Sequence, residues 1–239
     1  MSTYRKSSYL RRLLMIYIGF FALLACSFLF DFLPSLSQGV SNGIELGNEI
    51  NEAYQDEEPK QFYMLLNIPL CGSEGVELTP VTANTQITAY PTTIALEVTE
   101  PVAADQGVNQ IAFAAIGNSP LTYILMIGSA LCFPIIVVLM FLIIRSVRRS
   151  IREEEPLAKH NALLLRAIAL LTILSELLGK LGLWQMAKRA AVLLAESDYT
   201  VNTTFHLNYG ILLMGLLLLF SAEIFVIGRD LGEEQKLTI

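Results

Sequence analysis

The feature that most constrains this chain is a long run without a charged side chain, LTYILMIGSALCFPIIVVLMFLII (Leu121–Ile144). About 20 such residues in a helix cross the ~30 Å hydrocarbon core of a bilayer. Three more segments are long and mainly apolar: Leu13–Leu33, Ala162–Trp184 and Gly210–Gly228. With 54% hydrophobic and 16% charged residues, the 239-residue chain has too little polar surface for a soluble globule of this size. All four segments are predicted to be transmembrane helices, because a helix satisfies its own backbone hydrogen bonds in lipid.

Basic residues are distributed unevenly around these four segments. They cluster before the first and between the second and third: Arg5, Lys6, Arg11, Arg12, Arg145, Arg148, Arg149, Arg152 and Lys159. The positive-inside rule places both clusters in the cytoplasm. The predicted fold class is therefore an all-α transmembrane protein, a four-helix membrane bundle with cytoplasmic N and C termini. Lys188 and Arg189, just beyond the third span, lie on the outer side of this topology and oppose it.

The segment between the first two spans is too long for a structureless loop in a compact protein. It contains stretches rich in Thr, Val, Ile and Tyr, broken by Gly and Pro: Phe62–Leu70, VELTPVT, TQITAY and TTIALEVTE. This pattern predicts a small antiparallel β unit, so helices 1 and 2 enclose a small extracytoplasmic, β-rich insert. The insert is either a ligand-recognition module or a cap that packs over the outer helix ends.

The resulting segment order alternates between the two sides of the membrane. It comprises a basic cytoplasmic N-terminus (1–12), helix 1 (13–33), the extracytoplasmic insert (34–120), helix 2 (121–144), a basic cytoplasmic loop (145–161), helix 3 (162–184), an outer loop (185–209), helix 4 (210–228) and a cytoplasmic tail (229–239).

Ionisable side chains inside the spans are the strongest functional leads, because lipid rejects an unpaired charge. Arg166 lies about 6 Å above the cytoplasmic end of its helix, and Glu223 lies about 7.5 Å above the same face. We therefore expect these two residues to pair across adjacent helices. Asp31, Glu176 and Lys180 reach similar depths in the outer leaflet and form a second predicted cluster. That cluster is either a proton or ion site, or a polar clamp between helices.

Small residues within the spans indicate where helices approach closely. Glycine lets two backbones come together in a membrane, where packing replaces the hydrophobic effect between helices. The relevant glycines are Gly128, Gly179, Gly182 and Gly215.

The residues that usually carry soluble-enzyme chemistry are scarce. His160 and His206 fall on opposite sides of the predicted membrane, and the three cysteines have no metal-ligand spacing. The chain has no glycine-rich phosphate loop. We therefore expect a non-enzymatic protein without cofactor or metal. The basic run Arg145–Arg152 is followed at once by three glutamates, which favours contact with the lipid bilayer over direct nucleic-acid binding.

Two stretches resemble a known family. IIRSVRRSIREEEPLAKHNALLLRAIALL (Ile143–Leu171) and LLLLFSAEIFVIGRDLGEEQKLTI (Leu216–Ile239) resemble the bacterial membrane proteins classed as domain of unknown function 2975 (DUF2975). The resemblance rests on a basic turn with a proline before the third helix and an acid-rich ending that closes on Leu-Thr-Ile. The matching residues are Pro156, Asn161, Leu165, Arg166, Glu223, Gly228, Glu233, Glu234, Leu237, Thr238 and Ile239.

This resemblance implies a four-helix protein of the bacterial cytoplasmic (inner) membrane. It also implies a partner, since members are often encoded beside a small Cro-like helix-turn-helix regulator. The tail is the segment where such a regulator could dock, and its candidate contact residues are Arg229, Leu231, Glu233, Glu234, Leu237, Thr238 and Ile239.

Three functions are consistent with these observations. The leading hypothesis is a membrane protein that tethers or controls a cytoplasmic helix-turn-helix regulator, in response to the envelope state sensed outside. The alternatives are a small transporter or ion-coupled permease that uses Asp31, Glu176 and Lys180, and a structural subunit of a membrane complex.

Overall fold

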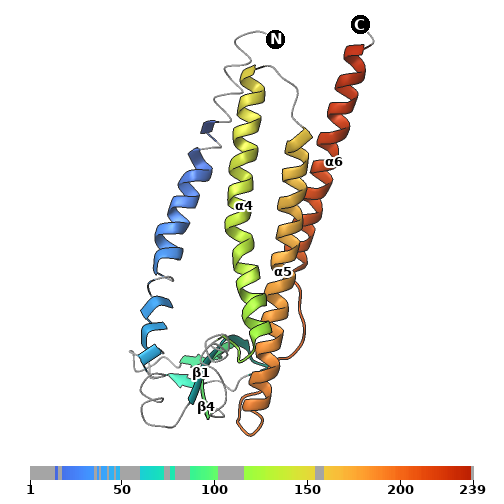
Figure 1. The fold of residues 1–239 in the computed structure, drawn as a ribbon. Coiled ribbons are helices and arrows are strands. Elements are labelled where there is room, and N and C mark those ends of the chain that lie inside the picture. The colour runs from blue at the N-terminus through green and yellow to red at the C-terminus, as the bar shows by residue number, and fades with distance from the viewer. Residues whose placement is uncertain are drawn as a thin grey trace. The chain divides into compact units, whose positions relative to one another are not determined.

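The fold combines long helices with two small sheets (Figure 1). The structure is a computed structural model that describes residues 14–15, 18–34, 37, 39–41, 43–45, 47–48, 60–72, 76–78, 87–101, 116–153 and 159–237. Its elements are the π-helical turn η1 (Phe28–Phe32), strands β1 (Lys60–Pro69), β2 (Val76–Leu78), β3 (Ile87–Ala89) and β4 (Thr93–Pro101), and helices α4 (Pro120–Glu153), α5 (Lys159–Leu193) and α6 (Tyr209–Leu237). The chain divides into two compact units, of which the first comprises residues 1–45, 131–175 and 208–239, and the second residues 46–130 and 176–207.

Three helices in the described part of the chain are long and apolar enough to cross a membrane. They cover Pro120–Ser150, His160–Leu193 and Tyr209–Gly228. The first predicted span is described only in part, and its apolar helix Ile18–Phe30 is shorter. The helices also extend beyond the predicted spans. α5 has 35 residues, or about 52 Å of helix, because charged residues outside the hydrocarbon core continue a helix as readily as apolar ones.

In the first unit, α5 and α6 are in close contact through small residues. Ala169 of α5 and Ala222 of α6 are fully buried. A Cβ atom built on Gly215 would lie 2.5 Å from Cγ1 of Ile173 and 3.3 Å from the backbone oxygen of Ala169. Gly215 therefore allows α6 to approach α5 more closely than a larger residue would, as its sequence position predicts.

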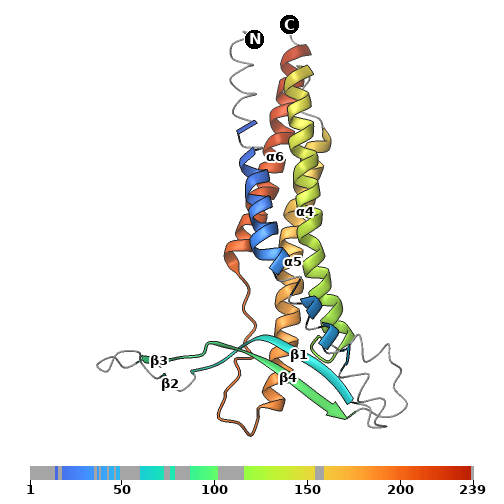
Figure 2. The ribbon, with the colours of Figure 1, turned by 90° about the vertical axis from the view of Figure 1, so that its left-hand side faces the viewer.

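The second unit contains the two sheets, each of two antiparallel strands (Figure 2). β1 pairs with β4, and β2 pairs with β3, which confirms the small β unit. The β1–β4 register shifts between Leu65 and Ile68, where Asn67 adopts a positive φ of 56°. Asparagine tolerates this left-handed conformation better than most residues, so it suits the bulge.

The other edge of β1 is joined by two further segments of the second unit. Met64 forms an isolated parallel bridge with Ile116, and Leu70 forms an antiparallel bridge with Val201. Backbone N–H groups of Cys71 and Asn202 complete the second contact, at 2.7 Å and 2.8 Å from their acceptors. The segment after α5 therefore returns along the end of β1.

The core of the second unit lies between the β1–β4 sheet and α5. Tyr63, Leu65 and Ile68 of β1 and Met186 and Ala190 of α5 form one buried cluster. Side chains of β4 alternate between exposed and half-buried, and its half-buried residues Ile94, Leu96 and Val98 pack against this cluster. Period-two alternation thus turns one face of the sheet onto the helix. Three more glycines bring α4 and α5 together here: Gly128, Gly179 and Gly182.

The close contact at Gly215 predicts a measurable packing effect. Gly215→Ala adds a methyl group against Ile173 and the Ala169 backbone, so we expect it to destabilise the protein by about 1–3 kcal/mol. This loss opposes the gain of about 1 kcal/mol that alanine brings in a helix. Thermal unfolding of the purified protein in detergent measures the change.

Gly228→Ala, on the same helix, is the matched control, because no atom of the described residues lies within 4 Å of the added methyl. It should keep or raise the unfolding temperature. Equal unfolding temperatures for the two variants would contradict a close α5–α6 contact.

Candidate functional site

The first candidate site is an ion pair between α5 and α6, both within the first unit. Arg166 donates from Nε to Oε1 of Glu223 and from Nη2 to Oε2, each at 2.9 Å. This two-bond geometry is the strongest arrangement for a guanidinium and a carboxylate. Both side chains are partly exposed, at 35% and 54%, so the medium around the helices determines how much the pair contributes. In lipid each charge would need the other.

The remaining residues predicted from the sequence fall in several places. Glu176 is buried on α5, whereas Lys180 lines an open pocket in the second unit. The side chain of Asp31 lies outside the described residues, so the predicted cluster of these three residues stays a prediction. α6 continues without a break from Gly228 to Leu237. The tail side chains from residue 229 onward also lie outside the described part.

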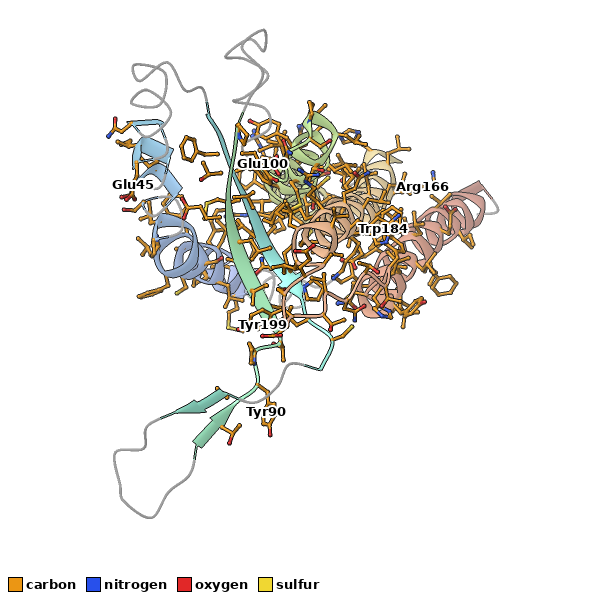
Figure 3. The ribbon with its side chains drawn as sticks, turned by 90° about the horizontal axis from the view of Figure 1, so that it is seen from below. Glu45, Tyr90, Glu100, Arg166, Trp184 and Tyr199 are labelled. Carbon is orange, nitrogen blue, oxygen red and sulfur yellow. The ribbon has the colours of Figure 1, made fainter. Side chains whose placement is uncertain are left out.

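The second candidate site attaches the β1–β4 sheet to α5 (Figure 3). Glu100, at the end of β4, accepts a bond of 2.6 Å from Nη2 of Arg189 and one of 2.8 Å from the Tyr63 hydroxyl. Nδ2 of Asn118 donates to its other oxygen at 3.3 Å, and Nε of Arg189 donates to the Tyr63 hydroxyl at 3.4 Å. One carboxylate thus joins both sheet strands, the segment before α4, and α5.

The phenol of Tyr63 is one of the groups whose pKa this environment shifts. Burial raises the pKa of Tyr63 above 10.0, and Glu100 raises it further, while hydrogen bonding to Arg189 acts in the opposite direction. Tyr63 therefore stays a neutral donor to Glu100 at physiological pH.

Lys188 and Arg189, the cations that opposed the predicted topology, both have local partners. Arg189 is paired with Glu100. The ammonium of Lys188 lies 3.6 Å from the centroid of the Trp184 ring, a cation–π contact. The Trp184 indole donates to the carbonyl of Thr203 at 3.1 Å and packs edge-on against Phe205. Both charges are satisfied within the second unit.

The Glu100–Arg189 pair was missed from the sequence, although one signal marked it. Glu100 falls on the same alternating face of β4 as the apolar residues Leu96 and Val98. A carboxylate at the end of an inward-facing row requires a partner. Its partner lies 89 positions away on a helix, and no sequence spacing links two such elements.

These features define a class: a helical protein with spans long and apolar enough for a membrane and a small sheet attached to one of them. The chain belongs to the family described as "Protein of unknown function (DUF2975)", whose sequence model matches residues 81–239. The resemblance carried by the basic turn and the acid-rich ending is therefore confirmed. Comparisons with curated proteins and with solved structures found no match.

The ion pair between α5 and α6 predicts coupling between its two residues. Arg166→Met and Glu223→Met each leave one unpaired charge, and the double variant leaves none. The double variant should therefore unfold at a higher temperature than either single variant, with a coupling of about 0.5–3 kcal/mol. Unfolding in lipid nanodiscs measures it, and strictly additive effects would show that the pair contributes nothing.

The sheet attachment predicts that Glu100 matters where a neighbouring glutamate does not. Glu100→Gln removes the charge that Arg189 faces, so it should destabilise the protein by about 1–3 kcal/mol. Glu97→Gln, on the exposed face of the same strand, should change stability by less than about 0.5 kcal/mol. Hydrogen exchange of the β1 amides locates the effect. Equal protection in both variants would rule out an anchoring role.

Proposed function

We propose that this protein is a non-enzymatic, four-span protein of the bacterial cytoplasmic membrane that tethers or controls a cytoplasmic helix-turn-helix regulator. In this proposal residues 13–33 form the fourth span. Both termini and the α4–α5 junction are cytoplasmic, and the sheets lie outside. The basic run at the end of α4 supports this orientation. The outer location of Lys188 and Arg189 fits it as well, because each has a local partner.

The observation that carries the proposal is the length of α6. The helix does not end at Gly228, where its apolar run ends, but continues to Leu237. The extension adds about 13 Å of helix beyond the span. It contains both charged residues and leucines, Leu231 and Leu237 among them. A preformed helix that combines both kinds of residue suits docking of a partner, because little ordering entropy is lost on binding.

A second observation supports contact with a partner on the proposed cytoplasmic side. Asn161, near the start of α5, is 7% exposed. Neither polar atom of its side chain has a hydrogen-bond partner among the residues that the structure describes. An unsatisfied buried amide costs about 1–3 kcal/mol. Such a group is retained most readily where another molecule or a rearrangement completes its bonding.

α5 provides a route by which an outer state could influence the inner partner. It is one continuous helix. Arg189, which is bonded to the sheet, and Arg166, which is bonded to α6, both belong to this helix. We propose that a change at the outer sheet shifts α5, and that the Arg166–Glu223 pair carries this shift to α6.

Affinity purification tests the tether. The chain is tagged at its N-terminus, extracted gently from membranes, and compared with a variant that lacks residues 229–239 and with the double variant Leu231→Ser, Leu237→Ser. A small helix-turn-helix protein should be recovered with the intact tail and lost from both variants. Gln235→Ser, in the same extension, is the control that should retain it.

Binding is then repeated with the purified regulator and the purified membrane protein. Equal recovery with and without the tail would remove the tail from the proposal. Recovery of no regulator by any form would overturn the tether itself.

A further inference from the structure

The second unit contains an open pocket of about 220 Å³ that the proposed function does not use. Its polar lining comes from three separate segments. Asn67 contributes from the β1 bulge, Lys180 from α5, and Asn202, Thr204 and His206 from the segment that follows α5. These segments meet because that segment returns along the end of β1.

The charge of this lining favours an anion. The residues that line the pocket include Lys180 and His206 but neither aspartate nor glutamate. Among the described residues, Lys180 forms no ion pair or hydrogen bond. An ionisable side chain near the membrane is costly without a partner. Within the described part of the chain, Lys180 therefore lacks the counter-charge that Arg166 and Arg189 have.

The amides add hydrogen-bond donors to this positive charge. Oδ1 of Asn202 accepts from the backbone N–H of Thr204 at 2.9 Å and also from the Thr204 hydroxyl. This fixes the amide and leaves its Nδ2 group to donate elsewhere. Together with Asn67 and Lys180, it offers donors from several directions, which suits the oxygens of a phosphate group.

The remaining wall is apolar and aromatic. Leu183, Trp184 and Phe205 line it, and the indole of Trp184 is held by its bond to Thr203. Lys180 is near the outer end of the span predicted for residues 162–184, in the proposed orientation. Aromatic residues with one polar end are typical of that depth. The pocket therefore combines a rim of cationic and amide donors with an apolar, aromatic wall.

We propose that this pocket binds the phosphate of an anionic phospholipid headgroup in the outer leaflet. The volume is below the range of about 300–1,000 Å³ for pockets that enclose drug-sized ligands, so it accommodates a headgroup while the acyl chains stay in the bilayer. The choice of leaflet rests on the orientation in the proposed function. The chemistry of the pocket does not.

Native mass spectrometry of the purified, delipidated full-length protein tests this inference. The probes are phosphatidylglycerol, phosphatidylcholine and inorganic phosphate. The protein should retain phosphatidylglycerol about ten-fold or more above phosphatidylcholine, because both lipids offer a phosphate but the choline of the second places an additional positive charge near Lys180. Lys180→Gln should abolish the preference and Lys180→Arg should restore it. Lys188→Gln, which removes a charge from the same helix outside the pocket, should keep it.

Three outcomes of this measurement would contradict the inference. Equal retention of the two lipids by the unaltered chain overturns the inference without relying on any variant. Unchanged preference in Lys180→Gln places the lipid elsewhere. Displacement of the lipid by inorganic phosphate would make a free anion the ligand and overturn the lipid assignment. No regulator enters this measurement, so failure here leaves the tether standing, and failure of the tether leaves this site standing.

Discussion

The constraint on which the rest of the structure depends is that α5 carries several charges through a helix otherwise suited to lipid. Charge in such a helix is tolerated only where a counter-charge or a polar cavity lies beside it. Along α5, two of the charges have a counter-charge and a third lies beside a pocket. Glu223 of α6 neutralises Arg166, and Glu100 of β4 neutralises Arg189. Lys180 has no such partner among the described residues and faces a pocket instead.

Each of these two ion pairs also holds one structural element against α5. The two bonds of Arg166 orient α6 against α5, and Gly215 lets the same two helices approach closely. Arg189 anchors a sheet of only two strands, which would be marginally stable alone. Burial of Tyr63, Leu65 and Ile68 against α5 supplies the apolar part of that attachment. Charge neutralisation and close packing therefore act on the same contacts.

Much of this could be predicted from the sequence, because the relevant geometry is regular. Apolar runs marked the helices, stretches rich in Thr, Val, Ile and Tyr marked the strands, and a constant helix rise placed Arg166 and Glu223 at one depth. The Glu100–Arg189 pair and the Lys180 pocket escaped prediction. Both depend on how a strand meets a helix far away in sequence, on the bulge at Asn67, and on the return of the segment after α5 along β1. The spacing of residues along the sequence does not predict contacts of this kind.

The family match covers only part of the second unit. It begins at residue 81, so Glu100 and Arg189 lie within it, whereas β1, with Tyr63 and Asn67, precedes it. The Glu100–Arg189 pair therefore belongs to the matched region. β1, which covers α5 and contributes Asn67 to the pocket, comes from the segment before the matched region. Because the neutralising carboxylate is on β4 and not on β1, the covering strand can differ without leaving Arg189 unpaired.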